Sequence, residues 1–184
     1  MVETTTTQAK QGSRGGMRPP QRRRPHSRYG QQMEEKQNLK KIYGIREQQL
    51  KKYFVTAHQS TVETGPGLIE ILEKRLDNAV YRAGWSPTRA AARQLVSHRL
   101  VTVNGRPVDV PSLQVKVGDV ISIKESKRKK AIFTNFTKSL QNVAAPSWIL
   151  LDPENFSFKV TGLPGADEAG LGVDIRAIVE YFAR

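Results

Sequence analysis

The stretch SPTRAAARQLVSHRLVTVNGRPV, residues 86–108, joins the signature of a capped helix to that of a tight hairpin. Ser86 is a favourable helix N-cap, and Pro87 suits the first helical position. Asn104-Gly105 is the preferred two-residue hairpin turn, because both positions tolerate positive φ. We therefore expect a short helix that leads directly into an antiparallel hairpin, packed together as one unit.

This helix sorts its side chains onto two sides at 100° per residue. One side is small and apolar, with Thr88, Ala91, Ala92, Leu95 and Val96. The other side carries Arg89, Arg93 and Ser97, each one turn from the next. Small alanines allow close packing on a neighbouring element. The arginines then form a row of fork-shaped donors that suits a phosphate backbone.

The chain of 184 residues has a formal net charge of +13, which favours a polyanionic partner, most often nucleic acid. Residues 139–184 hold three basic and six acidic residues, so the positive charge lies in residues 1–138. We expect the anion-binding surface in this first part. A basic but merely solvated surface is the alternative.

Composition excludes several classes of site. The chain has no cysteine, which rules out a disulfide scaffold or a cysteine-based zinc site. Its histidines, His26, His58 and His98, are far apart and lack ligand spacing. No apolar run is long enough for a transmembrane helix, and the N-terminus lacks the apolar core of a signal peptide. We expect no metal, no cofactor and no membrane partner.

Residues 1–28 contain little apolar sequence and several arginines, so we expect a disordered basic arm that becomes ordered on RNA. A transit peptide and a passive flexible tail are the alternatives. Residues 33–57 favour a helix with a packed stripe and a basic back, in which Gly44 marks either a kink or a break. TGPG at 64–67 predicts a turn, followed by a second helix from Leu68 to Ala83.

Beyond the hairpin, a third strand over 120–124 completes a small antiparallel sheet. Residues 132–143 favour a further helix, and 146–164 favour two short strands about a turn at Asp152-Pro153. We expect Trp85 and Trp148 in the core rather than as stacking platforms. A short final helix, capped by Asp174, ends the chain.

The segment RLDNAVYRAGWSPTRAAARQLVSHRLVTVNGRPVDVPSLQVKVGDVISI resembles the S-four RNA-binding module, a helix pair followed by a small sheet. The flanks MEEKQNLKKIYGIREQQLKKYF, PSWILLDPENFSFKV and DIRAIVEYFAR resemble the bacterial-type small-subunit ribosomal protein four family. The resemblance covers about residues 28–184. It implies an α+β fold with a helical lobe and a lobe that carries the module and its sheet.

The resemblance divides the chain into four parts. These are a disordered basic arm over 1–28, an N-terminal helical part over 29–74, the S-four module over 75–137, and a C-terminal part over 138–184. The last part comprises strands and a final helix that packs back on the helical lobe. Many members carry zinc-binding cysteines near the N-terminus, which this chain lacks.

The resemblance further implies a structural, non-enzymatic protein of the small ribosomal subunit. Such proteins bind ribosomal RNA early in assembly, at a multi-helix junction of the 5′ domain of a 16S-type RNA. They also lie near the path by which mRNA enters the subunit, where a contribution to translational accuracy is expected. They contact neighbouring small-subunit proteins, for example protein five. The expected location is a cytoplasmic rather than an organellar ribosome.

The candidate RNA-binding residues come from the basic segments and from the module. Positions matched to the family's RNA contacts are Arg75, Ser86, Arg89, Arg93, Gln94, His98 and Asn104. The basic segments and the rest of the module add Arg22, Arg23, Arg24, Arg28, Lys36, Lys40, Lys41, Arg46, Lys51, Lys52, Arg82, Ser97, Arg99 and Arg106. Tyr29 or Tyr43 is expected to add base stacking. We expect Asp77 to orient Arg75 or to cap a turn.

Two other functions remain as alternatives. KRLD at 74–77 is similar to the aspartate motif of pseudouridine synthases, but too few residues lie outside the module for their catalytic domain. A stress factor that acts on stalled ribosomes would need only the module and a basic tail. The helical flanks argue against that function.

Overall fold

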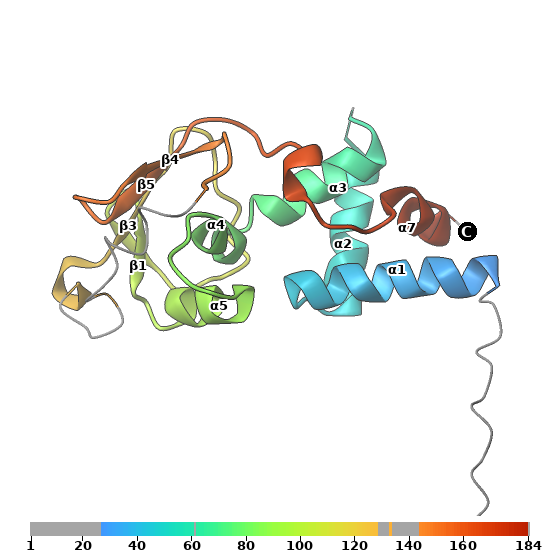
Figure 1. The fold of residues 1–184 in the computed structure, drawn as a ribbon, viewed down its shortest axis with the longest axis horizontal. Helices are drawn as coiled ribbons and strands as arrows, with labels where there is room; N and C mark the ends of the chain where they lie inside the picture. Colours follow the sequence, from blue (N-terminus) through green and yellow to red (C-terminus); the bar gives the residue numbers. More distant parts are fainter. Residues whose placement is uncertain (1–26, 61, 129–132, 134–143, 184) are drawn as a thin grey trace, which may run out of the picture.

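The computed structural model describes residues 27–60, 62–128, 133 and 144–183, and these form two lobes joined side by side (Figure 1). The helices are α1 (Arg28–Tyr43), α2 (Glu47–His58), α3 (Thr64–Glu73), α4 (Leu76–Arg82), α5 (Arg89–Ser97) and α7 (Ile175–Phe182). The strands are β1 (Val101–Val103), β2 (Arg106–Val108), β3 (Val120–Ile123), β4 (Ile149–Asp152) and β5 (Ser157–Val160). The described residues also include the short 3₁₀ turns η1 (Glu125–Lys127) and η3 (Asp167–Ala169). The α+β class is confirmed.

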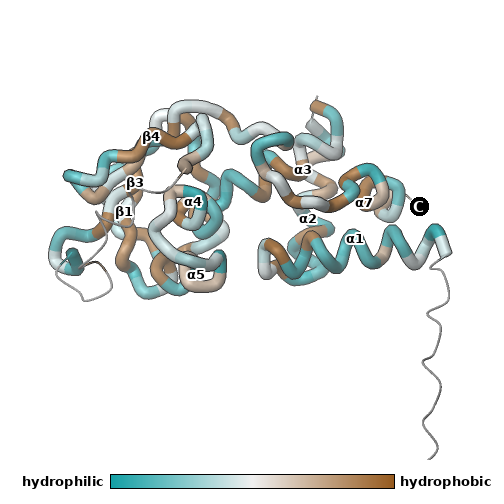
Figure 2. The backbone as a smooth tube through the Cα atoms, in the orientation of Figure 1, coloured by the Kyte–Doolittle hydropathy of each residue, from teal (hydrophilic) through white to brown (hydrophobic). Residues whose placement is uncertain are grey.

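The helical lobe consists of α1, α2, α3 and α7 (Figure 1). Gly44 ends α1 in the left-handed conformation, with φ of 60°, and donates its N–H to carbonyl oxygens of the last turn. Gly44 therefore marks a break between two helices, not a kink in one. Fully buried leucines and isoleucines from all four helices form the core of this lobe (Figure 2).

Two expectations about residues 64–83 are wrong. TGPG is not a turn but the start of α3, because a proline in the first helical turn has no N–H to satisfy. The helix also does not continue to Ala83, since the chain is extended at Arg75 and α4 begins afresh at Leu76. The cause is a distant segment. Leu76 N–H donates to Leu113 O at 2.8 Å, and Val115 N–H donates to Lys74 O at 2.8 Å.

The second lobe, called the module here, contains α4, α5 and one antiparallel sheet in the order β2-β1-β3-β5-β4. Asn104 and Gly105 have φ of 49° and 78°, so the expected β1–β2 hairpin turn is confirmed. Strands β4 and β5 also form as expected, but they do not pack back on the helical lobe. They extend the module's sheet through pairing of β5 with β3, which is a correction to the expected division at residue 138.

The core of the module lies between α4, α5 and one face of the sheet (Figures 1 and 2). Trp85 and Trp148 are both buried in it, as expected. The ring of Trp85 meets that of Phe158 edge-on, with centroids 4.9 Å apart. This geometry is favourable for aromatic pairs and fixes β5 against the start of the 85–88 loop.

The helix caps were predicted with mixed success. Thr88, not Ser86, caps α5, since its hydroxyl accepts from the N–H of Ala91 while Ser86 donates to Thr88 O. Asp174 caps α7 as expected and accepts from two backbone N–H groups. From β5 the chain crosses back to the helical lobe, where α7 packs on α1 and α3 (Figure 1).

Part of the predicted organisation lies outside the described residues. This holds for the basic arm as far as residue 26 and for nearly all of the helix expected over 132–143. Within the described part, no helix has the combined length and apolar character that crossing a membrane requires.

Candidate nucleic-acid interface

The boundary between the lobes is built around a buried carboxylate, that of Glu73, which is 1% exposed. It accepts from Tyr43 of α1, from Asn78 and from the Arg82 guanidinium at 2.8 and 3.0 Å. Arg82 also donates to Ala169 O at 2.7 Å. The Glu73 carboxylate and its partner Arg82 therefore connect α1, α4 and the segment at Ala169, which are far apart in the sequence. Burial and the Glu73 carboxylate together raise the pKa of Tyr43, so its hydroxyl stays a donor.

A second carboxylate, that of Asp77, holds two of the predicted RNA contacts. It accepts from Arg75 Nε and Nη2 at 3.0 and 2.7 Å, which confirms that Asp77 orients Arg75. It also accepts from Arg93 Nε at 2.8 Å. Asp77 is 3% exposed, so the aspartate that a pseudouridine synthase would need is enclosed by arginines.

Arg93 joins the module to the helical lobe. Its Nη1 donates to Gly44 O at 2.6 Å and its Nη2 to Tyr43 O at 2.9 Å. These carbonyls lie at the C-terminal end of α1, where helix carbonyls lack partners and a positive charge is stabilising. A Cβ on Gly44 would lie 3.3 Å from Arg93 Nη1, so the close approach also depends on that glycine.

Arg89 occupies the same boundary. Its guanidinium lies 5.0 Å from the ring centroid of Tyr43 and 4.5 Å from that of Tyr81, and its Nε donates to Asn78. We call Glu73, Asp77 and the side chains bound to them the junction network. The network uses the arginine row of α5 to join the lobes. Phosphate contact by Arg89 and Arg93 stays a prediction.

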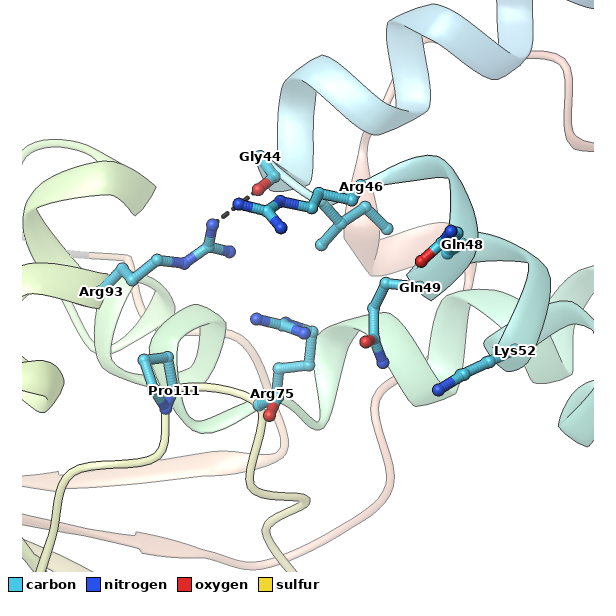
Figure 3. Close-up of a pocket in the computed structure, with 10 residues that line it drawn as sticks. Gly44, Arg46, Gln48, Gln49, Lys52, Arg75, Arg93 and Pro111 are labelled. Atoms are coloured by element: carbon cyan, nitrogen blue, oxygen red, sulfur yellow. Dashed lines mark hydrogen bonds between the residues drawn. The ribbon is translucent and has the colours of Figure 1, made fainter.

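Beside the junction network lies a cleft of about 620 Å³ between the lobes (Figure 3). Its walls come from the Gly44 turn, the start of α2, the α3–α4 break, α5 and the loop at Pro111. Among the described residues that line this interlobe cleft are four cations and no carboxylate: Arg46, Lys52, Arg75 and Arg93. Arg46 and Lys52 are exposed, and their side chains have no hydrogen-bond partner within the described residues.

The N-terminus of α2 adds partial positive charge to the cleft. Its N-cap residue, Arg46, makes no side-chain cap, so the first N–H groups of this twelve-residue helix have no side-chain acceptor. Arg46, Gln48 and Gln49 of this first turn line the cleft (Figure 3). Helix N–H groups together with guanidinium groups are suited to phosphate oxygens. The chemistry of the cleft therefore suits an anion such as phosphate.

Lys36 and Lys40 were predicted on the basic back of the first helix but bind Glu47 of α2, each at 2.7 Å. Lys36 is buried and also donates to the Tyr181 hydroxyl at 3.0 Å. Burial alone would lower the pKa of Lys36, but the hydrogen bonds to Glu47 and Tyr181 outweigh it and raise the pKa. These lysines tie α1 to its neighbours, whereas Arg28, Lys41 and Lys51 remain exposed.

On the module, Gln94, Ser97, His98 and Arg106 are exposed. Asn104 serves the fold, because its side chain donates to Asp119 and accepts from the N–H of Val120. Arg99 binds Asp109 at 2.6 Å but its side chain is still 71% exposed. Ser86 is half-buried beside the start of α5.

Stacking by Tyr43 is not possible in this arrangement, because the ring is 2% exposed inside the junction network. Tyr29 is 49% exposed, and stacking by it stays a prediction. Arg22, Arg23 and Arg24 lie outside the described residues.

Four site residues were not predicted from the sequence: Gln48, Gln49 and Pro111 in the cleft, and Glu73 in the junction network. No local signal marks Glu73, since its partners come from α1 and α4. Gln48 and Gln49 could have been predicted as part of the site, because they lie within one helical turn of the predicted contact Arg46.

Comparisons with known proteins agree with this architecture. Residues 74–121 match the family described as S4 domain, and residues 6–73 match that described as Ribosomal protein S4/S9 N-terminal domain.

Full-length relatives extend the match over most of the chain. The chain is 44% identical to the small ribosomal subunit protein uS4 of Herpetosiphon aurantiacus, over 89% of this chain and 78% of that protein. It is 43% identical to uS4B of Nitrosomonas europaea, over 88% and 78%, and 42% identical to uS4 of Roseiflexus castenholzii, over 90% and 82%. The chain therefore belongs to the uS4 family of small ribosomal subunit proteins.

Proposed function

We propose that the chain is a structural protein of the small ribosomal subunit that binds ribosomal RNA and catalyses no reaction. The interlobe cleft carries the proposal, because it combines an uncapped helix N-terminus with two cations, Arg46 and Lys52, whose side chains have no partner within the described residues. Arg75 and Arg93 also line it but are paired with Asp77. Phosphate groups of a folded RNA match this surface, and backbone contacts of this kind position a protein on its RNA.

The RNA we propose is a multi-helix junction of the 5′ domain of 16S-type ribosomal RNA. Two lobes joined through the junction network suit a junction, where helices leave in different directions. Recognition would then depend on RNA shape, because side chains cannot read the deep major groove of A-form RNA. The exposed Lys41, Lys51 and Arg106 extend the basic surface beyond the cleft, whereas the exposed Arg28 is paired with Glu180 at 2.9 Å.

In the assembled subunit, we propose an early role for the chain in assembly and a place near the path by which mRNA enters. Neighbouring small-subunit proteins, protein five among them, would cover part of its remaining surface. The ribosome would be its location in the cell. These roles rest on membership of the uS4 family, together with the basic surface that we propose for RNA.

The test is a titration of the full chain against a 5′-domain fragment of small-subunit ribosomal RNA, with excess tRNA as competitor, across a salt series. We expect tight binding that survives the competitor. If six to ten phosphates are contacted, affinity should fall roughly a thousandfold or more between 50 and 200 mM salt. Binding shared equally with tRNA would contradict a specific junction and favour the stress-factor alternative.

A further inference from the structure

The module carries a second hollow on the opposite side of α5 from the interlobe cleft. At 100° per residue, Ala91, Gln94 and His98 point away from the side that carries Arg89 and Arg93. Together with the 85–87 loop and Leu100, they line a pocket of about 260 Å³. We call this hollow the base pocket. It takes no part in the junction network.

The lining of the base pocket differs from that of the cleft. Its inner part is apolar, formed by the buried side chains of Trp85, Leu95 and Leu100. Its polar groups lie at the rim and are the side chains of Ser86, Gln94 and His98. Among the described residues, no Arg, Lys, Asp or Glu lines it. Gln94 and His98 are exposed, and their side chains have no hydrogen-bond partner within the described residues.

These features fit a flat ring with polar edges. The apolar inner part would cover the ring, while the amide of Gln94 can both donate to and accept from the ring edge. The volume lies below the roughly 300 Å³ at which pockets for drug-sized molecules begin, so one ring system fits better than a whole nucleotide. Nucleobases are such rings, and RNA-binding proteins recognise unstacked bases by their edges.

The surroundings favour a base over an apolar side chain of a neighbouring protein. A leucine or phenylalanine would cover Gln94 without offering it a hydrogen bond, which is costly for a desolvated amide. Arg99 follows His98 directly, its side chain is 71% exposed, and its Nε and Nη2 donate to Asp109. The phosphate attached to an inserted nucleotide would have to share this guanidinium with the Asp109 carboxylate. The RNA bound in the cleft would pass along the same helix.

We propose that the base pocket receives one unpaired nucleobase of the bound RNA, turned out of its stack. This inference rests on the proposed RNA-binding function and deepens it. The cleft would hold phosphates irrespective of sequence, whereas the base pocket would select for an unpaired nucleotide at one position. The contribution of one buried base corresponds to roughly five- to hundredfold in affinity.

The proposal is tested with a variant whose side chain fills the base pocket. Ala91→Phe places a ring in it from its own wall, and Ala90→Phe adds the same ring at the next, exposed position outside it. Complexes of the full chain with the 5′-domain fragment are probed at base edges with dimethyl sulfate, kethoxal and carbodiimide, and at the backbone with hydroxyl radicals. Thermal unfolding of each free variant reports whether it folds.

We expect the wild type and Ala90→Phe to protect one unpaired base, and Ala91→Phe to leave it reactive with the backbone footprint retained. Affinity should fall five- to hundredfold for Ala91→Phe and less than twofold for Ala90→Phe. If Ala91→Phe does not fold, the double variant Gln94→Ala/His98→Ala, at exposed positions, should expose the same base.

An unchanged base reactivity in both pocket variants, with the backbone footprint present, would overturn the base pocket and leave the proposed function standing. That result is also expected if a protein side chain fills the pocket. Absence of any footprint with the wild type would instead overturn the proposed function, and with it this inference.

Discussion

The junction network and the interlobe cleft use the same kind of side chain for different purposes. Arg75 and Arg82 lie against buried carboxylates, which satisfy their donors inside the protein. The side chains of Arg46 and Lys52, at and within α2, have no partner within the described residues and line the open cleft. The comparison teaches that a basic residue in an RNA-binding sequence is not by itself a phosphate contact. Its nearest carboxylate decides whether it is free to bind RNA.

The largest effect should come from the centre of the junction network. Glu73→Gln removes a buried charge and leaves Arg82 without its counter-ion, which should lower the free energy of unfolding by about 3 kcal/mol. Urea denaturation of the full chain measures this difference. Glu70→Gln is the matched control on the same helix, since its pair with Lys74 is half-exposed and contributes under about 1 kcal/mol. Equal losses in the two variants would show that the network does not support the fold.

A smaller effect is expected from Arg93, which links the lobes. Arg93→Lys keeps the charge but loses the fork that reaches Tyr43 O, Gly44 O and Asp77 together. We expect a loss of about 1–2 kcal/mol in unfolding free energy, from hydrogen bonds that carry a charge. Small-angle X-ray scattering should also show a broader distribution of interlobe distances. An unchanged distribution would mean that other contacts set the angle between the lobes.

The smallest effect concerns Glu47, which binds Lys36 and Lys40 at the half-exposed edge of the helical lobe. Burial acts to raise the pKa of Glu47, but the two lysine hydrogen bonds lower it below its ordinary value of 4.5. A lowered pKa stabilises the fold above the unfolded value, and this stability is lost as the pH falls through the folded value. Glu47→Gln should cost under about 1 kcal/mol at pH 7, with the difference shrinking below pH 4.5.

Urea midpoints at several pH values measure this dependence. Glu154→Gln, at an exposed position in the β4–β5 turn, is the control and should follow the wild type throughout. A difference for Glu47→Gln that grows with acidification would contradict the assigned ion pairs.

Features with a local cause could be predicted from the sequence. The Asn104-Gly105 turn needs positive φ at two successive positions, and few residue pairs allow it. The cap at Asp174 and the strands on either side of Asp152-Pro153 likewise depend on near neighbours. The break between α3 and α4 could not be predicted, because it is made by backbone hydrogen bonds to residues 113–115.

The same distinction holds for the site. The helical periodicity of α5 correctly separated its arginines from its apolar side. The partners of those arginines, however, come from α1 and α4. Only the folded chain brings Tyr43 and Asp77 to them. Arg46 and Lys52 were predicted from charge alone, and the structure adds the uncapped helix N-terminus and the cleft beside them.

The most direct test of this account is the salt dependence of binding to the 5′-domain fragment in two double variants. Arg46→Gln/Lys52→Gln should reduce the slope of log affinity against log salt by about 1.4 to 1.8, as expected for two lost phosphate contacts. Glu73→Gln/Arg82→Gln removes a junction cation together with its carboxylate and should leave the slope unchanged. A reduced slope in the junction variant, with none in the cleft variant, would contradict the assignment of phosphate binding to the cleft.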